Sequence, residues 1–195
     1  MKDVFVIATN NPGKLREISD ILGGLGARAV SQKEAGISVS PEETGETFTE
    51  NALIKARAAC KASGLPAIAD DSGLCVDALG GAPGVYSARF CEKDHALFLL
   101  SKMKGEKNRR AHFECAAACV FPDGEELVAV GRCDGVITEE PRGTGGFGYD
   151  PVFLDEASGK TFAELPEEKK NGISHRGRAL NELARLLKEK RYADR

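Results

Sequence analysis

The sequence predicts an α/β protein that forms one domain over residues 1–195. Short apolar runs typical of buried strands alternate with segments whose apolar residues recur at helical spacing. No repeat, low-complexity tract or linker divides the chain. With 42% hydrophobic and 29% charged residues, the chain has an ordinary globular composition and is long enough to bury a substantial core.

The chain opens with a strand, a helix and a second strand. Residues 4–8 are apolar, and the turn after them leads into a helix with Asn11 as a good N-cap and Pro12 at the first helical position. Glycines at 23–24 end this helix, and the second strand is expected at 27–31.

The next helix is marked at both ends. Thr47 and Glu50 form a capping box at its start, and Gly64 ends it. Asn51 and Lys55 stand four residues apart, so they share a neighbouring face of this helix. An exposed Lys55 is the simpler interpretation of that residue taken alone.

The most unusual stretch is 67–90. Its apolar start, 67–69, predicts the end of a buried strand, and Ser72 with Gly73 permits a sharp turn. The adjacent acids 70–71 repel each other, which indicates a cation, a partner base or a functional need. The alternative is a pair of aspartates that simply initiates the turn.

The remaining elements complete the α/β pattern. A short amphipathic helix is expected at 94–103, two long strands at 110–121 and 126–138, and a short strand at 152–154. Ser174 caps the final helix.

Charge and cysteine content narrow the class of protein. A formal net charge of −3 gives no reason to expect a nucleic acid or an anionic membrane as partner, and no membrane-spanning run or signal peptide is seen. No C-x-x-C or zinc-ligand spacing occurs, and most cysteines fall in apolar runs. We therefore expect reduced thiols, no disulfide framework and a cytoplasmic location. The cysteines are Cys60, Cys75, Cys91, Cys115, Cys119 and Cys133.

Cations, aromatics and acids together suggest a nucleotide. Lys14 and Arg176 lie in the first turns of helices, where phosphate binds well, although a plain capped turn also explains residues 9–14. The glycine-rich loop at 143–150 is not a P-loop, and its aromatics either stack on a base or anchor the loop. The acidic pairs, Glu42-Glu43 and Asp70-Asp71, suit Mg²⁺ with phosphate oxygens and water as its other ligands.

Five ordered motifs, TNNPGK, EETGETFTENALIKA, ADDSGLCVDALGGAPGVYSARF, GTGGFGYDPVF and ISHRGRAL, resemble the inosine/xanthosine triphosphate pyrophosphatase family. The resemblance implies hydrolysis of ITP, dITP and XTP to the monophosphate and pyrophosphate with Mg²⁺, which cleanses the nucleotide pool. It also implies a homodimer and an elongated central mixed β-sheet flanked by helices, with two lobes and the active-site cleft between them.

The same resemblance assigns roles to residues. Asp71 would be the general base and would share metal binding with Glu43. The triphosphate would be held by Thr9, Asn10, Asn11, Pro12, Gly13, Lys14, Lys55 and Ser72. The nucleoside and base pocket would be formed by Phe147, Gly148, Tyr149, Asp150, Lys170, His175 and Arg176. The choice of Lys170 over Lys169 rests on its spacing before His175.

Some expectations stay open at this stage. Asp70 should point to the opposite face of its strand from Asp71, where it could brace a lysine instead of binding metal. The segment 90–112 is shorter than the family pattern, which puts any interface it serves in doubt. Donors from His175 or Arg176 would favour the 6-oxo group of ITP and XTP over the amino group of ATP.

Three rival functions are weaker. A non-catalytic nucleotide-binding regulator would not need Glu43 and Asp71 together, and a serine hydrolase using Ser72 and His175 would need a G-x-S-x-G motif that is missing around Ser72. A promiscuous phosphatase acting on other triphosphates is compatible with the same fold.

Overall fold

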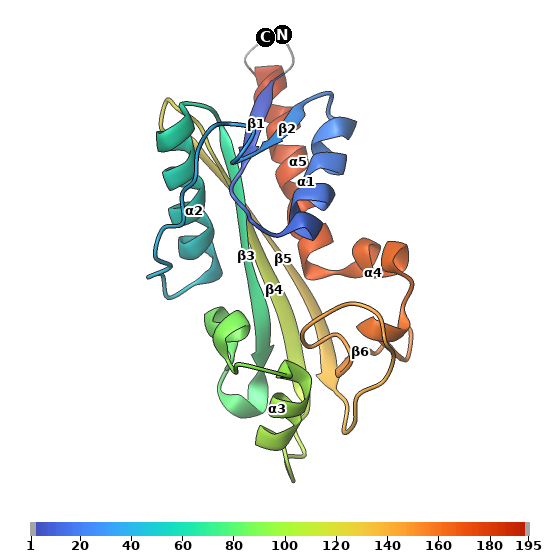
Figure 1. The fold of residues 1–195 in the computed structure, drawn as a ribbon. Helices are drawn as coiled ribbons and strands as arrows, with labels where there is room; N and C mark the ends of the chain where they lie inside the picture. The colour runs from blue at the N-terminus through green and yellow to red at the C-terminus, as the bar shows by residue number, and fades with distance from the viewer. Residues whose placement is uncertain (1–2, 194–195) are drawn as a thin grey trace. The chain divides into compact units, whose positions relative to one another are not determined.

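The computed structural model describes residues 3–193 and shows the predicted alternation of strands and helices (Figure 1). The elements are β1 (Val4–Ile7), α1 (Pro12–Gly24), β2 (Arg28–Ser31), α2 (Phe48–Ser63), β3 (Ala67–Val76), α3 (His95–Lys102), β4 (Arg110–Val120), β5 (Glu126–Ile137), β6 (Phe153–Asp155), β7 (Lys160–Thr161), α4 (Glu167–Ile173) and α5 (His175–Ala193). Short 3₁₀ helices lie at η1 (Asp77–Leu79), η2 (Gly84–Arg89) and η3 (Phe162–Glu164).

The described strands form one seven-stranded sheet in the order β2-β1-β3-β4-β5-β6-β7. β1 pairs in parallel with both β2 and β3, whereas β6 pairs antiparallel with β5 and β7. The predicted α/β class, with a mixed sheet and flanking helices, is therefore confirmed. No helix in the described part of the chain is long and apolar enough to cross a membrane.

The predicted starts of the first two helices are confirmed by their N-caps. The Asn11 side chain accepts hydrogen bonds from the backbone N–H groups of Gly13 and Lys14, and Thr47 makes the full capping box with Glu50. These side chains satisfy N–H groups that have no partner within their own helix. The positions where α1 and α2 begin therefore follow from local sequence signals. Residues predicted to bind phosphate or metal lie near both helix starts.

One prediction around the acidic pair is wrong. The strand does not end before Asp70, and no sharp turn forms at Ser72 and Gly73, because β3 runs without interruption from Ala67 to Val76. The acids are compatible with a strand interior since each has a lysine partner from a neighbouring helix. The short elements α4 and β7 were not predicted from the sequence.

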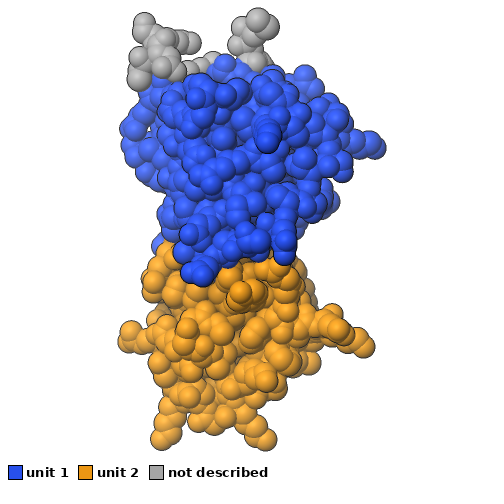
Figure 2. All heavy atoms as spheres, turned by 90° about the vertical axis from the view of Figure 1, so that its left-hand side faces the viewer, with its two compact units in different colours: residues 1–71, 115–131, 178–195 blue, residues 72–114, 132–177 orange. Residues whose placement is uncertain are grey.

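The chain divides into two compact units, coloured separately in Figure 2. Unit 1 takes the described residues of the ranges 1–71, 115–131 and 178–195, and unit 2 takes 72–114 and 132–177. Three strands, β3, β4 and β5, contribute residues to both units. The single domain expected from the sequence stays a prediction.

Each unit has its own hydrophobic core. In unit 1, side chains from α1 and α5 pack against β1, β3 and β4, and the two helices lie side by side in Figure 1. In unit 2, an aromatic core forms around Phe113, Phe153 and Phe162, whose rings contact one another. Most residues predicted for phosphate and metal binding belong to unit 1, and those predicted for the nucleoside belong to unit 2.

Candidate active site

The predicted phosphate loop of unit 1 is a tightly hydrogen-bonded turn. The Thr9 hydroxyl accepts from the Asn11 N–H at 3.1 Å, and Asn11 Oδ1 accepts from the N–H groups of Gly13 at 2.8 Å and Lys14 at 3.3 Å. Asn10 through Gly13 are exposed. Residues 9–14 therefore form the capped turn that the sequence predicts, and phosphate binding by this loop stays a prediction.

Asp70 is the partner of Lys14. Lys14 Nζ lies 2.8 Å from Asp70 Oδ2, and the Asp70 side chain is only 1% exposed. The Cys115 thiol also contacts this carboxylate, with Sγ 3.9 Å from Oδ2. The expectation that Asp70 could brace a lysine instead of serving the metal is confirmed as far as its lysine contact goes.

Strand alternation explains why the adjacent acids have different partners. Ile68 packs in the core with α1 and α5 residues, and Asp70, two residues on, shares its side of β3 and meets Lys14 of α1. Asp71 points to the other side, where it meets Asn51 and Lys55 of α2. The two carboxylates therefore occupy different environments although they are neighbours in the chain.

Asp71 lies at the centre of a charged cluster within unit 1. Lys55 Nζ lies 3.0 Å from Asp71 Oδ1 and 3.1 Å from Glu43 Oε1, so one ammonium bridges both carboxylates. Asn51 Nδ2 donates to Asp71 Oδ2 at 3.3 Å. The exposed-lysine interpretation of Lys55 is wrong, since its side chain is only 16% exposed.

Asn51 belongs to this cluster although no role was predicted for it from the sequence. It is fully buried, and while its amide donates to Asp71, its Oδ1 accepts from the Gly45 N–H at 2.9 Å. A Cβ at Gly45 would lie 2.7 Å from this Oδ1, so a side chain there would break the close approach. Asn51 thereby links the loop that carries Glu43 to Asp71. In the sequence, the only indication of this role was that Asn51 stands four residues before Lys55.

Burial and charge act against each other in the pair formed by Asp71 and Lys55. Burial raises the pKa of Asp71; the Lys55 ammonium and Asn51 offset part of this effect, while Glu43 adds to it. Burial by itself lowers the pKa of Lys55, but Asp71 and Glu43 outweigh it and leave that pKa raised. Lys55 thus keeps its charge, and Asp71 is a stronger base than an exposed aspartate.

The carboxylates of this cluster fit a magnesium ion. The described residues contain no group of three or more His, Cys, Asp or Glu side chains placed to hold a metal. Mg²⁺ needs fewer, because it is usually held by one or two carboxylates and completes its shell with waters and phosphate oxygens. Glu43 and Asp71 already lie close enough together to share one cation, the Lys55 ammonium.

In unit 2, the glycine-rich loop is fixed by Asp150. Asp150 is 4% exposed, and its Oδ2 accepts from the Phe147 N–H at 2.9 Å and from Lys170 Nζ at 2.5 Å. Gly146 has a φ of 69°, and a Cβ there would lie 2.0 Å from Asp150 Oδ2. The loop can close around this carboxylate only because a glycine stands at 146.

The two loop aromatics have different roles. The Phe147 ring is 64% exposed with Lys170 Nζ 5.1 Å from its centre, so it can still receive a base. Tyr149 is 5% exposed, its ring meets His95 edge to face at 5.4 Å, and its hydroxyl donates to the Ser87 carbonyl at 2.9 Å. Of the two interpretations left open for the loop aromatics, the contacts of Tyr149 match anchoring of the loop, and its part in substrate binding stays a prediction.

The structure also separates the adjacent lysines of α4. Lys170 reaches Asp150 and the rings of Phe147 and Phe162, whereas Lys169 is exposed. The preference for Lys170 agrees with these contacts, and the sequence could offer only spacing in its favour.

His175 and Arg176 open α5 and are both buried, at 7% and 9% exposure. The His175 ring stacks on Phe113, with ring centres 4.7 Å apart and planes at 11°. Arg176 Nη2 donates to Ser72 Oγ at 3.2 Å. Phe113 was not predicted as a site residue, because an alternating strand residue gives no sign of what it stacks on.

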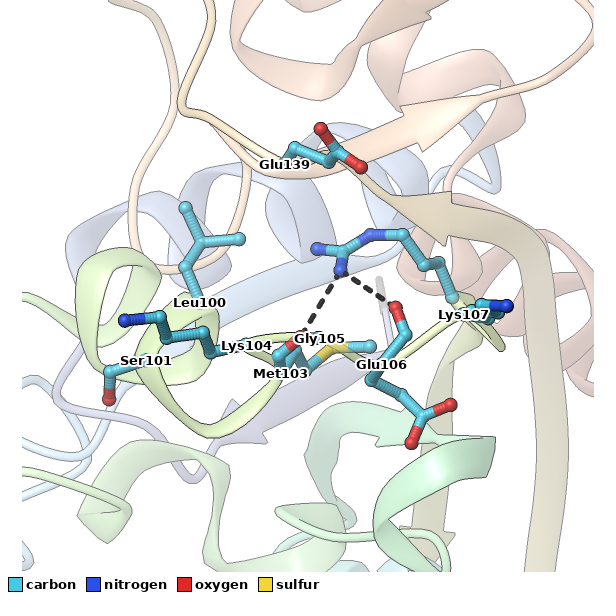
Figure 3. Close-up of a pocket in the computed structure, with 9 residues that line it drawn as sticks. Leu100, Ser101, Met103, Lys104, Gly105, Glu106, Lys107 and Glu139 are labelled. Atoms are coloured by element: carbon cyan, nitrogen blue, oxygen red, sulfur yellow. Dashed lines mark hydrogen bonds between the residues drawn. The ribbon is translucent and has the colours of Figure 1, made fainter.

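A cavity of about 630 Å³ in unit 2 lies apart from all these residues. Figure 3 shows Leu100, Met103 and Glu106 from the end of α3 and the turn after it, facing Glu139. Arg109 also lines it and donates to the carbonyls of Met103, Glu106, Ile137 and Thr138. None of the predicted site residues lines this cavity, which contains charges of both signs.

Comparisons with known proteins agree on one group. The sequence model of the Ham1 family matches residues 5–186. A protein of Leptospira interrogans named dITP/XTP pyrophosphatase is 47% identical, covering 97% of this chain and 100% of that protein. A protein of the same name from Escherichia coli (strain K12) is 50% identical, covering 94% of this chain and 97% of that protein. The structure of a Ham1 protein from Staphylococcus aureus superposes with a TM-score of 0.90 at 40% identity, covering 96% of this chain and 100% of that one.

Proposed function

The chain belongs to the Ham1 family, and from this premise we propose that it is a nucleoside-triphosphate diphosphatase acting on non-standard purine nucleotides. It hydrolyses dITP, ITP and XTP to the monophosphate and pyrophosphate. The name dITP/XTP pyrophosphatase, carried by relatives that this chain matches over nearly its full length, supports the substrate class. The single geometric observation that carries the proposal is the Lys55 ammonium held between Asp71 and Glu43.

The reaction is attack of water on the α-phosphorus. A new phosphorus–oxygen bond forms from the water, the bond from the α-phosphorus to the bridging oxygen breaks, and pyrophosphate leaves. Asp71 takes the proton of the water, a role supported by its raised pKa and by the hydrogen bond from Asn51 that holds its carboxylate in place.

Cationic groups lower the barrier by binding charge that develops on the phosphate oxygens. Lys14 at the start of α1 and Lys55 on α2 supply two of these cationic groups. Asp70 orients the ammonium of Lys14, and Asp71 orients that of Lys55. Glu43 and Asp71 would hold Mg²⁺, which supplies further charge neutralisation at the triphosphate when it is bound.

The nucleoside is assigned to the residues of unit 2. Phe147 offers an exposed ring for the base, and Asp150 with Lys170 fixes the loop that presents it. Donors from His175 and Arg176 favour a purine with a 6-oxo acceptor, because the 6-amino group of adenine would face them with another donor. Stacking on Phe113 orients the imidazole for this task.

We extend the proposal to location and assembly. All six cysteines lie in the described part of the chain and are free thiols, which supports a cytoplasmic location. A homodimer is proposed from the family resemblance of the sequence.

A panel of nucleoside triphosphates tests the function. The purified full-length chain is incubated with Mg²⁺ and dITP, XTP, GTP or ATP, and pyrophosphate and orthophosphate are measured separately. We expect pyrophosphate from dITP and XTP, with kcat/KM at least about a hundredfold above that for ATP, and none after EDTA is added. Equal rates for all four, or release of orthophosphate alone, would refute the proposal.

A further inference from the structure

Ser87 is a buried residue of η2 that connects three parts of unit 2. Its Oγ accepts from the Leu74 N–H at 2.9 Å and donates to the Gly84 carbonyl at 2.6 Å. Its carbonyl accepts from the Tyr149 hydroxyl at 2.9 Å. With only 7% of its surface exposed, Ser87 makes these bonds away from water.

The bond to Leu74 replaces a missing strand partner. β1 pairs with β3 only at Ala67 and Ile68, so the edge of β3 beyond them has no β1 partner. Backbone N–H groups two residues apart point to the same edge of a strand, and along this edge Val76 donates to the Ala82 carbonyl while Leu74 donates to Ser87. The segment around Ser87 therefore supplies hydrogen-bond acceptors to the backbone N–H groups of β3 just after Ser72.

The bond from Tyr149 fixes the glycine-rich loop to the same residue. Burial raises the pKa of Tyr149, so its hydroxyl keeps the proton that it donates. Tyr149 directly precedes Asp150 in the chain and follows Phe147 by two residues, so fixing Tyr149 restrains both. The Tyr149 ring, held from one side by His95, leaves this segment little freedom to move.

We propose that Ser87 is a positioning residue for nucleoside binding. It holds Tyr149, and through it the segment 147–150, in a fixed relation to β3 two residues after Ser72. The segment GVYSARF, which contains Ser87, thereby acquires a role that its sequence alone did not reveal. The proposal rests on the proposed function for its kinetic consequence, although the anchoring itself does not.

The test compares Ser87→Ala with a matched serine. Ser63 at the end of α2 also donates to a carbonyl, that of Ala59, and accepts a backbone N–H, that of Leu65, but it contacts no predicted site residue. We expect Ser87→Ala to raise KM for dITP about tenfold while kcat changes less than about threefold, and Ser63→Ala to change neither. Thermal unfolding of both variants shows what each loses in stability alone.

Amide hydrogen exchange separates failure of this proposal from failure of the proposed function. Ser87→Ala should speed exchange over 145–150, and Ser63→Ala should not, whether or not dITP is hydrolysed. Should Ser87→Ala fail to fold, Tyr149→Phe removes only the bond to the Ser87 carbonyl and should give the same increase. Unchanged exchange over 145–150 in the folded variant, or a KM equal to that of Ser63→Ala in an active enzyme, would overturn the positioning role.

Discussion

The residues proposed to bind phosphate in unit 1 and those proposed to bind the nucleoside in unit 2 are held in place in different ways. In unit 1, lysines on α1 and α2 pair with adjacent carboxylates of β3, so charged groups are held by regular elements. In unit 2, a glycine-rich loop is fixed by the buried Asp150, and the aromatic core supports His175 at the start of a helix.

The difference matches the two chemical tasks that we propose for these residues. Charge that develops during phosphoryl transfer is stabilised best by groups that do not reorganise, and the elements of unit 1 hold theirs by several short contacts. A base is recognised by its face and its edge donors and acceptors, for which an exposed ring such as Phe147 and a loop of fixed shape suffice. Variants in unit 1 should therefore lower turnover, and variants in unit 2 should weaken binding.

The largest effect is expected at Asp71. Asp71→Asn keeps the shape of the side chain but removes the proton acceptor, so kcat for dITP should fall by about 10²–10⁴-fold. KM should change far less, because Lys14 and Lys55 remain. Steady-state kinetics with pyrophosphate detection measures both values, and circular dichroism checks the fold. A kcat near that of the unmodified protein would show that Asp71 is not the base.

The next effect sharpens the contrast from the side of unit 2. Lys170→Met removes the ammonium that donates a hydrogen bond to Asp150 and lies over the Phe147 ring. KM for dITP should therefore rise about tenfold to a hundredfold. Lys169→Met is the matched control, since Lys169 is exposed, and should change KM less than about twofold. If kcat fell and KM held, the division of tasks between the two sides would be wrong.

The same division explains how much could be read from the sequence. Local signals specified the starts of α1 and α2 and the end of α2: the caps at Asn11 and Thr47 and the glycine at 64 are adjacent in the chain to these helices. The four-residue spacing of Asn51 and Lys55 likewise placed both on the face that meets Asp71. Such features depend on neighbours in sequence, which a pattern can record.

Features that depend on distant partners were missed or misread. The turn expected at Ser72 was wrong, since the repulsion between Asp70 and Asp71 is relieved by lysines that no local pattern assigns to them. The sequence left open whether Tyr149 stacks on a base or anchors its loop, because the carbonyl that accepts from its hydroxyl lies 62 residues away in the chain. Assigning the site residues themselves needed five motifs and a family resemblance, because no single spacing specified them.

The smallest of the three effects concerns Asp70 and tests whether orientation of Lys14 matters. Asp70→Asn keeps an oxygen that can accept from Lys14 but loses the charge, so the ammonium is held less firmly. We expect kcat/KM for dITP to fall about threefold to tenfold, since the ion pair is replaced by a weaker hydrogen bond from the ammonium to a neutral amide oxygen. The control is Glu126→Gln, which weakens the exposed pair with Arg57 and should leave turnover unchanged. A loss at Asp70 as large as that at Asp71 would mean that both carboxylates take part in the chemistry, and the separation of the two faces of β3 into a lysine support and a reaction centre would fail.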